Sequence, residues 1–122
     1  MQQIDMFYEI IEFLQLHNQD VVIRKDLNTF GAEVTSKEMS FYGKELDPEQ
    51  NHPIPELELL LRFDSKTGNL EIEDKTTYNY VGDDFVEPIF EGSVENSSVI
   101  YYTLSRMISE YKTKCLVEEL EA

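Results

Sequence analysis

Apolar residues recur at helical spacing near both ends of the chain. Over residues 3–17 they fall three or four positions apart, as on one face of an α-helix, and Ile10 widens that face. A second run with this spacing lies near the C-terminus and consists of Ile100, Leu104, Met107, Ile108, Tyr111 and Cys115. The pattern predicts a helix at each end. The second helix is expected to begin with Ser93 as its N-cap and Glu95 in its first turn, and residues 118–122 are expected to fray.

The middle of the chain is typical of β-structure. Its clearest feature is a hairpin over residues 56–75, where leucines and Phe63 alternate with polar positions on both sides of a turn at residues 65–68. Placing Asp64 opposite Asn69 fixes the register. The resulting pairs are Phe63–Leu70 and Leu61–Ile72 on the inner face, and Arg62–Glu71 and Glu58–Lys75 on the outer face. Because the outer pairs join opposite charges, the hairpin is expected to be locally neutral.

Other strands are expected on both sides of this hairpin. A turn over residues 28–31 is expected to separate the first two strands, and a proline-containing loop is expected over residues 43–55. Pro88 indicates that the last strand is an edge strand or an irregular segment. One expected strand begins at residues 21–23, and the others are expected over residues 33–42, 78–81 and 85–90.

Together these elements predict an α+β fold. We expect an antiparallel meander of four to five strands, with the N-terminal and C-terminal helices packed on one face. The length of 122 residues suits a single compact domain spanning residues 1–122.

The charge narrows the classes of partner. The chain has 25 acidic and 10 basic side chains and a formal charge of −15, so phosphates are repelled. Direct binding to nucleic acid or to an anionic membrane is therefore not expected. There is no basic, apolar leader at the N-terminus and no apolar run of membrane-spanning length, which favours a cytoplasmic location.

Few residues are suited to catalysis or to holding a cofactor. Cys115 is the only cysteine and lies on an apolar helical face, while His17 and His52 are the only histidines. We find no nucleotide-binding glycine loop and no nucleophile motif, and Lys66 stands where a calcium loop over residues 64–75 would need an oxygen ligand. The sequence therefore predicts no enzyme activity, no cofactor and no metal site.

One enzyme pattern remains as an alternative. Asp64, Glu73 and Lys75 resemble the Asp…Glu-x-Lys signature of restriction-endonuclease-like nucleases, in which two carboxylates hold a divalent metal and the lysine assists the attacking water. Alternation along the hairpin places all three on one face. The resemblance covers about a dozen residues and implies a metal-dependent nuclease.

The acidic residues are concentrated in three segments that contain no basic residue. Asp5, Glu9 and Glu12 share one face of the first helix, where like charges cost about 0.2–0.5 kcal/mol per pair. The candidate partner-binding residues, one group from each segment, are Asp5, Glu9 and Glu12; Glu45, Asp47 and Glu49; and Asp83, Asp84, Glu87, Glu91 and Glu95.

This excess of carboxylates predicts recognition of a basic protein. A small soluble domain typically carries a net charge of magnitude about 2–8, whereas this chain carries −15. In size and charge the chain resembles small acidic inhibitors, namely immunity proteins to nuclease toxins and phage anti-restriction or anti-CRISPR proteins. The leading hypothesis is a nucleic-acid mimic that blocks the basic groove of a nuclease or nucleic-acid-binding protein, with exposed aromatic residues as anchors. The alternative is a non-catalytic interaction domain with a different protein partner.

Overall fold

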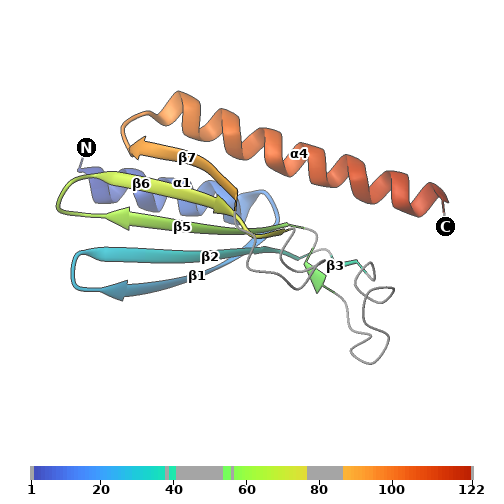
Figure 1. Ribbon diagram of the computed structural model, residues 1–122, viewed down its shortest axis with the longest axis horizontal. Coiled ribbons are helices and arrows are strands. Elements are labelled where there is room, and N and C mark those ends of the chain that lie inside the picture. Colours follow the sequence, from blue (N-terminus) through green and yellow to red (C-terminus); the bar gives the residue numbers. More distant parts are fainter. Residues whose placement is uncertain (1, 38, 41–53, 56, 77–86, 122) are drawn as a thin grey trace.

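The fold is a five-stranded antiparallel meander with a helix at each end, as a computed structural model shows (Figure 1). The model describes residues 2–37, 39–40, 54–55, 57–76 and 87–121. The strand order is β1-β2-β5-β6-β7, and β3 and β4 form a separate two-stranded ladder. The elements are α1 (Gln3–Leu16), β1 (Gln19–Asp26), β2 (Thr29–Ser36), β3 (Met39–Ser40), β4 (Ile54–Pro55), β5 (Glu58–Asp64), β6 (Asn69–Asp74), β7 (Glu87–Ser93) and α4 (Ser97–Glu121).

One face of the sheet carries the core, and both helices supply side chains to it. Phe7 of α1 stacks on Phe63 of β5 with ring centroids 5.0 Å apart, and Ile100 and Leu104 of α4 are fully buried in the same cluster. In Figure 1, α1 lies behind the sheet and α4 runs along the β7 side. The predicted α+β class, with both helices on one face, is therefore confirmed. Tyr111 and Cys115 belong to the expected apolar face of α4, but their side chains lie outside the described part of the chain.

The predicted register of the central hairpin is confirmed. Phe63 pairs with Leu70, Leu61 with Ile72 and Arg62 with Glu71. The backbone N–H of Lys75 donates to the Glu58 carbonyl at 2.9 Å, which continues the same register by one more pair. Because side chains alternate along a strand, this register places the even-numbered residues of β5 and the odd-numbered residues of β6 on the side of the sheet away from the helices.

The first turn and the second strand differ from expectation. Asp26 pairs with Thr29, so the turn consists of Leu27 and Asn28 alone, and residues 29–31 belong to β2 rather than to a turn. Leu27 adopts a φ of 53°, a conformation that glycine and asparagine favour and leucine rarely adopts. The strand expected over 33–42 is also wrong in extent. It begins at Thr29 and ends at Ser36, whose hydroxyl accepts the Leu57 N–H at 3.0 Å.

The strand expected over 85–90 is β7, which runs from Glu87 to Ser93 and lies at one edge of the sheet, as Pro88 indicated. The predicted N-cap at Ser93 is wrong. Ser93 pairs with Asn69, and the next residue, Val94, donates its N–H to the Gly68 carbonyl at 2.9 Å. These bonds hold the chain in the sheet, so α4 begins at Ser97 and Glu95 lies in the preceding turn, where its N–H donates to the Ser93 hydroxyl. The strand expected over 78–81 lies outside the described residues.

Candidate functional site

The carboxylates predicted on the first helix are exposed. Asp5, Glu9 and Glu12 lie on α1 away from its buried residues, which are Phe7, Ile10, Ile11 and Leu14. The helix has no basic residue in its last turn that could offset them. α1 therefore presents the row of negative charge that the sequence predicted.

The structure brings Glu95 to this helix. Glu9 and Glu95 both line a shallow cleft of about 170 Å³ between α1 and the start of α4, together with Ile10, Val94 and Tyr101 among others. Asp5, Glu9, Glu12 and Glu95 are called the helix-side carboxylates below. They combine two of the three acidic segments on one side of the molecule.

Tyr101 ties the two helices together within this acidic surrounding. Its ring packs edge-on against Phe13 with centroids 5.0 Å apart. Partial burial raises the pKa of the Tyr101 phenol above its ordinary value, and the negative charges of Glu9 and Glu12 raise it further. The neutral phenol is thus the form that the folded protein favours.

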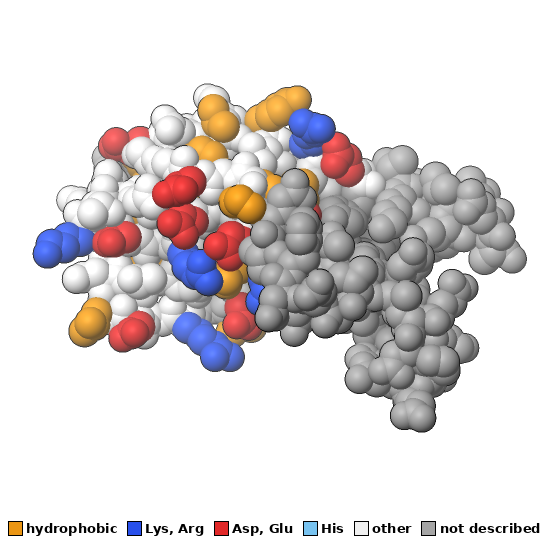
Figure 2. Space-filling model, in the orientation of Figure 1, with side chains coloured by type: hydrophobic (Ala, Val, Ile, Leu, Met, Phe, Trp, Pro, Cys, Tyr) orange, Lys and Arg blue, Asp and Glu red, His pale blue; other side chains and the backbone are white. Residues whose placement is uncertain are grey.

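Glu91 lies on the other face of the sheet, together with Glu71 and Glu73 of the central hairpin. It pairs with Glu71 of β6, and Glu73 follows two positions along the same face. Figure 2 views this solvent-facing side and shows acidic side chains gathered over β6 and β7 beside a basic one. Glu71, Glu73 and Glu91 are called the sheet-face carboxylates.

The pairing geometry brings Glu71 and Glu91 close together. Because Lys75 and Glu58 are hydrogen-bonded across β5 and β6, alternation directs the Glu71 backbone toward β5 and makes its pair with Glu91 a non-hydrogen-bonded one. The Cα atoms of such a pair are about 4.5 Å apart, closer than in the hydrogen-bonded kind. Like charges directly opposite each other destabilise a sheet.

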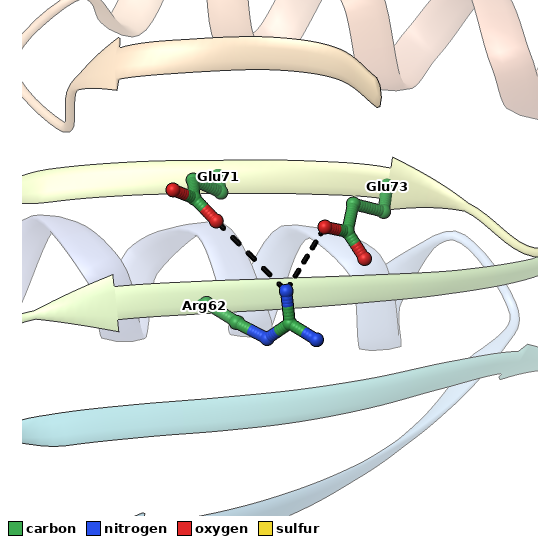
Figure 3. A network of polar contacts seen from close by, with 3 residues as sticks. All are labelled: Arg62, Glu71 and Glu73. Carbon is green, nitrogen blue, oxygen red and sulfur yellow. Dashed lines mark hydrogen bonds and ion pairs between the residues drawn. The ribbon is translucent and has the colours of Figure 1, made fainter. Parts of the chain in front are cut away.

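Arg62 offsets part of this charge. Its Nη1 lies 2.9 Å from Glu73 Oε1 and 3.9 Å from Glu71 Oε2, so one guanidinium serves two carboxylates (Figure 3). The expected Arg62–Glu71 contact is therefore present but is the longer of the two. On this face of the hairpin Glu71 and Glu73 share the guanidinium of Arg62, and Glu91 of β7 adds a third carboxylate beside them.

The remaining candidates cannot be placed with these two groups. The backbone of Glu87 pairs with Asp74 on β6, and its side chain lies outside the described part of the chain. The other candidates, which lie outside the described residues, are Glu45, Asp47, Glu49, Asp83 and Asp84.

The residues of the nuclease alternative are separated along the hairpin. Asp64 lies opposite Asn69 in the confirmed register and Glu73 pairs with Leu60, four residues away, which corresponds to about 13 Å along the strands. Asp64 Oδ1 accepts the N–H of Lys66 at 2.8 Å, while Glu73 binds Arg62. Among the described residues there is no group of three or more His, Cys, Asp or Glu side chains placed to hold a metal ion.

Comparisons of the chain with protein-family models, with curated proteins and with solved structures found no match. None of the helices in the described segments is long and apolar enough to cross a membrane.

Proposed function

We propose that this protein is a non-catalytic acidic inhibitor that binds the basic surface of a nucleic-acid-processing enzyme and blocks access to it. The observation that carries the proposal is the direct opposition of Glu71 and Glu91 on the solvent-facing side of the sheet, with Glu73 beside them. This arrangement lowers the stability of the free protein. A basic partner would relieve that repulsion on binding, so the same charges that weaken the fold would strengthen a complex.

The spacing of the sheet-face carboxylates suits a surface that binds phosphates. Glu71 and Glu73, two positions apart on one strand, are separated by about 6.5–7 Å, and Glu91 adds a second row on the neighbouring strand. These spacings resemble those of phosphates along a nucleic-acid strand. Lysine and arginine side chains arranged to bind a nucleic-acid backbone would therefore find acceptors at suitable intervals on a rigid sheet.

The helix-side carboxylates supply a second negative surface that widens the electrostatic field. Two tyrosines nearby in the helices are exposed, Tyr8 by 46% and Tyr102 by 68%, and could serve as the aromatic contacts that anchor many protein interfaces. Long-range attraction from both surfaces would speed encounter with a positively charged partner, and this acceleration falls as salt screens the field.

The test separates local recognition from bulk charge. The triple variant Glu71→Gln, Glu73→Gln and Glu91→Gln removes the sheet-face carboxylates. The matched control Asp5→Asn, Glu9→Gln and Glu12→Gln removes the same number of charges from α1. Partners are captured from a lysate of the source organism with the unmodified protein and identified, and their affinities for all three proteins are measured over a range of salt concentrations.

We expect the captured partner to be a nuclease or another nucleic-acid-binding protein whose activity the wild-type protein inhibits. The sheet-face variant should lose most of its affinity, and the helix control should retain the larger part. A partner with a neutral or acidic contact face, or an affinity independent of salt, would contradict the proposal. Such a result would favour an interaction domain of a different kind.

A further inference from the structure

The two edges of the sheet are built differently. The β7 edge contains Pro88, and its pairing with β6 shifts register between Ile72 and Glu73, so the edge is interrupted by a proline and a bulge. Both features hinder the addition of another strand. The β1 edge pairs in unbroken register with β2 through all eight of its residues and contains neither proline nor glycine. Figure 1 shows β1 as the outermost strand on its side.

The centre of β1 is apolar and accessible. Val22 is 54% exposed on the outer face of the sheet, and Ile23 is 37% exposed on the inner face beside the half-buried Val21. An edge strand with an unbroken register and an apolar, accessible centre can pair with another strand.

A hydrogen bond at the end of β1 fixes the direction of the free backbone groups along this edge. Lys37 donates its N–H to the Asn18 carbonyl at 3.3 Å, which makes Asn18 and Lys37 a hydrogen-bonded pair in the β1–β2 ladder. Alternation then directs the N–H and C=O groups of Val22 and Arg24 toward β2. The corresponding groups of Val21, Ile23 and Lys25 point outward along the free edge.

We infer that β1 pairs antiparallel with β1 of a second copy of this chain, about a two-fold axis at Val22. In this register Val21 and Ile23 exchange hydrogen bonds with Ile23 and Val21 of the second copy, and the two Val22 side chains meet on the axis. The axis is perpendicular to the sheet, so the two five-stranded sheets join into one, with the helices of both copies on the same face.

Charge complementarity selects this register. It places Asp20 opposite Arg24 of the second copy, and by symmetry Arg24 opposite Asp20, so that two ion pairs flank the apolar centre. Moving the axis to Ile23 would place Asp20 opposite Asp26, and moving it to Val21 would place Asp20 opposite Val22. Of the registers that keep the outward-pointing groups paired, the one centred on Val22 is the one that satisfies both charges.

Asp20 and Arg24 have neutral cross-strand partners within their own chain. Across β2 they face Thr35 and Gly31 respectively, and neither forms an ion pair with another described residue. Reversing either charge therefore changes the proposed contact between copies and leaves the cross-strand pairs within one copy neutral. This inference does not rest on the proposed inhibitory function, because it concerns the opposite edge of the sheet from Glu91.

The experiment measures the mass of the full-length protein in solution as a function of concentration, by analytical ultracentrifugation. We expect the wild-type protein to form dimers. Asp20→Arg and Arg24→Asp should each be folded monomers, because each places like charges opposite each other twice. Mixing the two variants should restore a dimer, since both positions then carry arginine in one chain and aspartate in the other, and every cross-chain pair again joins opposite charges.

Hydrogen exchange gives a second, residue-specific readout. The amide protons of Val21 and Ile23 should become protected as wild-type protein is concentrated, whereas that of Val22, already bonded to β2, should be protected at every concentration. A wild-type protein that stays monomeric, a dimer that both charge reversals leave intact, or a mixture of variants that fails to associate would each overturn the inference.

Discussion

Glu71 and Glu91 lie directly opposite each other on β6 and β7, in a non-hydrogen-bonded pair on the solvent-facing side of the sheet. Arg62 lies 3.9 Å from Glu71 and is held more closely by Glu73 at 2.9 Å. The pair therefore opposes folding at a position where any neutral polar residue would be accommodated. The proposed recognition of a basic partner would explain charge that weakens the fold at this exposed position.

Replacing Glu91 with Gln should stabilise the free protein. The substitution keeps the shape of the side chain and removes the repulsion with Glu71, so we expect the free energy of unfolding to rise by about 0.2–1 kcal/mol at low salt. The gain should shrink as added salt screens the repulsion in the wild-type protein. Urea unfolding at two salt concentrations measures both effects.

Glu33→Gln is the matched control for this prediction. Glu33 is exposed on the same face of the sheet, but its cross-strand neighbours are Val22 and Leu60. Its neutralisation removes the same charge without relieving a direct pair. If Glu33→Gln stabilises the protein as much as Glu91→Gln, the gain comes from net charge and not from the opposition of Glu71 and Glu91.

The sequence predicted the central hairpin well because two independent patterns agreed. A slip of one residue would have moved Phe63 and Leu61 to the solvent side and separated Arg62 from Glu71, so a single register satisfied both faces. The start of α4 was misplaced because the competing interaction is remote. Ser93 is a good N-cap by local chemistry, but the bond from Val94 to Gly68 keeps it in the sheet, and nothing near Ser93 in sequence indicates that bond.

The candidate site was predicted in part for a similar reason. The exposure of Asp5, Glu9 and Glu12 follows from helical periodicity, which is local. The approach of Glu95 to Glu9 and the opposition of Glu91 to Glu71 depend on how α4 and β7 return to the rest of the fold. The sequence held one signal of excess charge on this face. Arg62 of β5 is a single cation for the two glutamates Glu71 and Glu73 of β6, so one carboxylate lacks full compensation.

Thr76→Val should destabilise the end of the central hairpin. Thr76 is fully buried, its Oγ1 accepts the Glu58 N–H at 2.9 Å and its hydroxyl donates to the Glu58 carbonyl at 3.3 Å. Valine preserves the shape but leaves the Glu58 N–H without this acceptor, so we expect a loss of about 1–3 kcal/mol in the free energy of unfolding. Chemical denaturation measures it.

Thr103→Val is the control for the buried hydroxyl. The Thr103 hydroxyl donates to the Val99 carbonyl at 2.8 Å within α4, where that carbonyl already belongs to the helix. We expect its loss to change stability by no more than about 0.5 kcal/mol. Equal effects of the two substitutions would show that the β-branched methyl group, and not the buried hydrogen bond, determines the result.

Gly68→Ala should destabilise the hairpin turn through the backbone. Gly68 has a φ of 78°, and a Cβ atom there would also overlap the side-chain amide of Gln3. The left-handed conformation alone costs a residue other than glycine about 1–2 kcal/mol. A double-mutant cycle with Gln3→Ala separates the two causes, because truncating Gln3 removes the overlap and leaves the backbone strain. Complete recovery in the double variant would show that the overlap, and not φ, is responsible.

Tyr101 should make stability depend on pH in the alkaline range. Its pKa is raised above 10.0 in the folded protein by burial and then by Glu9 and Glu12, so the unfolded chain loses the phenolic proton at lower pH than the folded one. The contribution of Tyr101 to the free energy of unfolding is fully present below the pKa that this phenol has in the unfolded chain. It is lost as pH rises through the pKa of the phenol in the folded protein. Tyr101→Phe keeps the ring against Phe13 and should flatten this part of the decline.

Glu9→Gln should reduce the decline in the wild-type background and leave its slope unchanged in the Tyr101→Phe background. Urea unfolding of the four proteins at neutral pH and at several values above 10.0 measures these differences, and parallel profiles for wild type and Tyr101→Phe would exclude Tyr101 as their source.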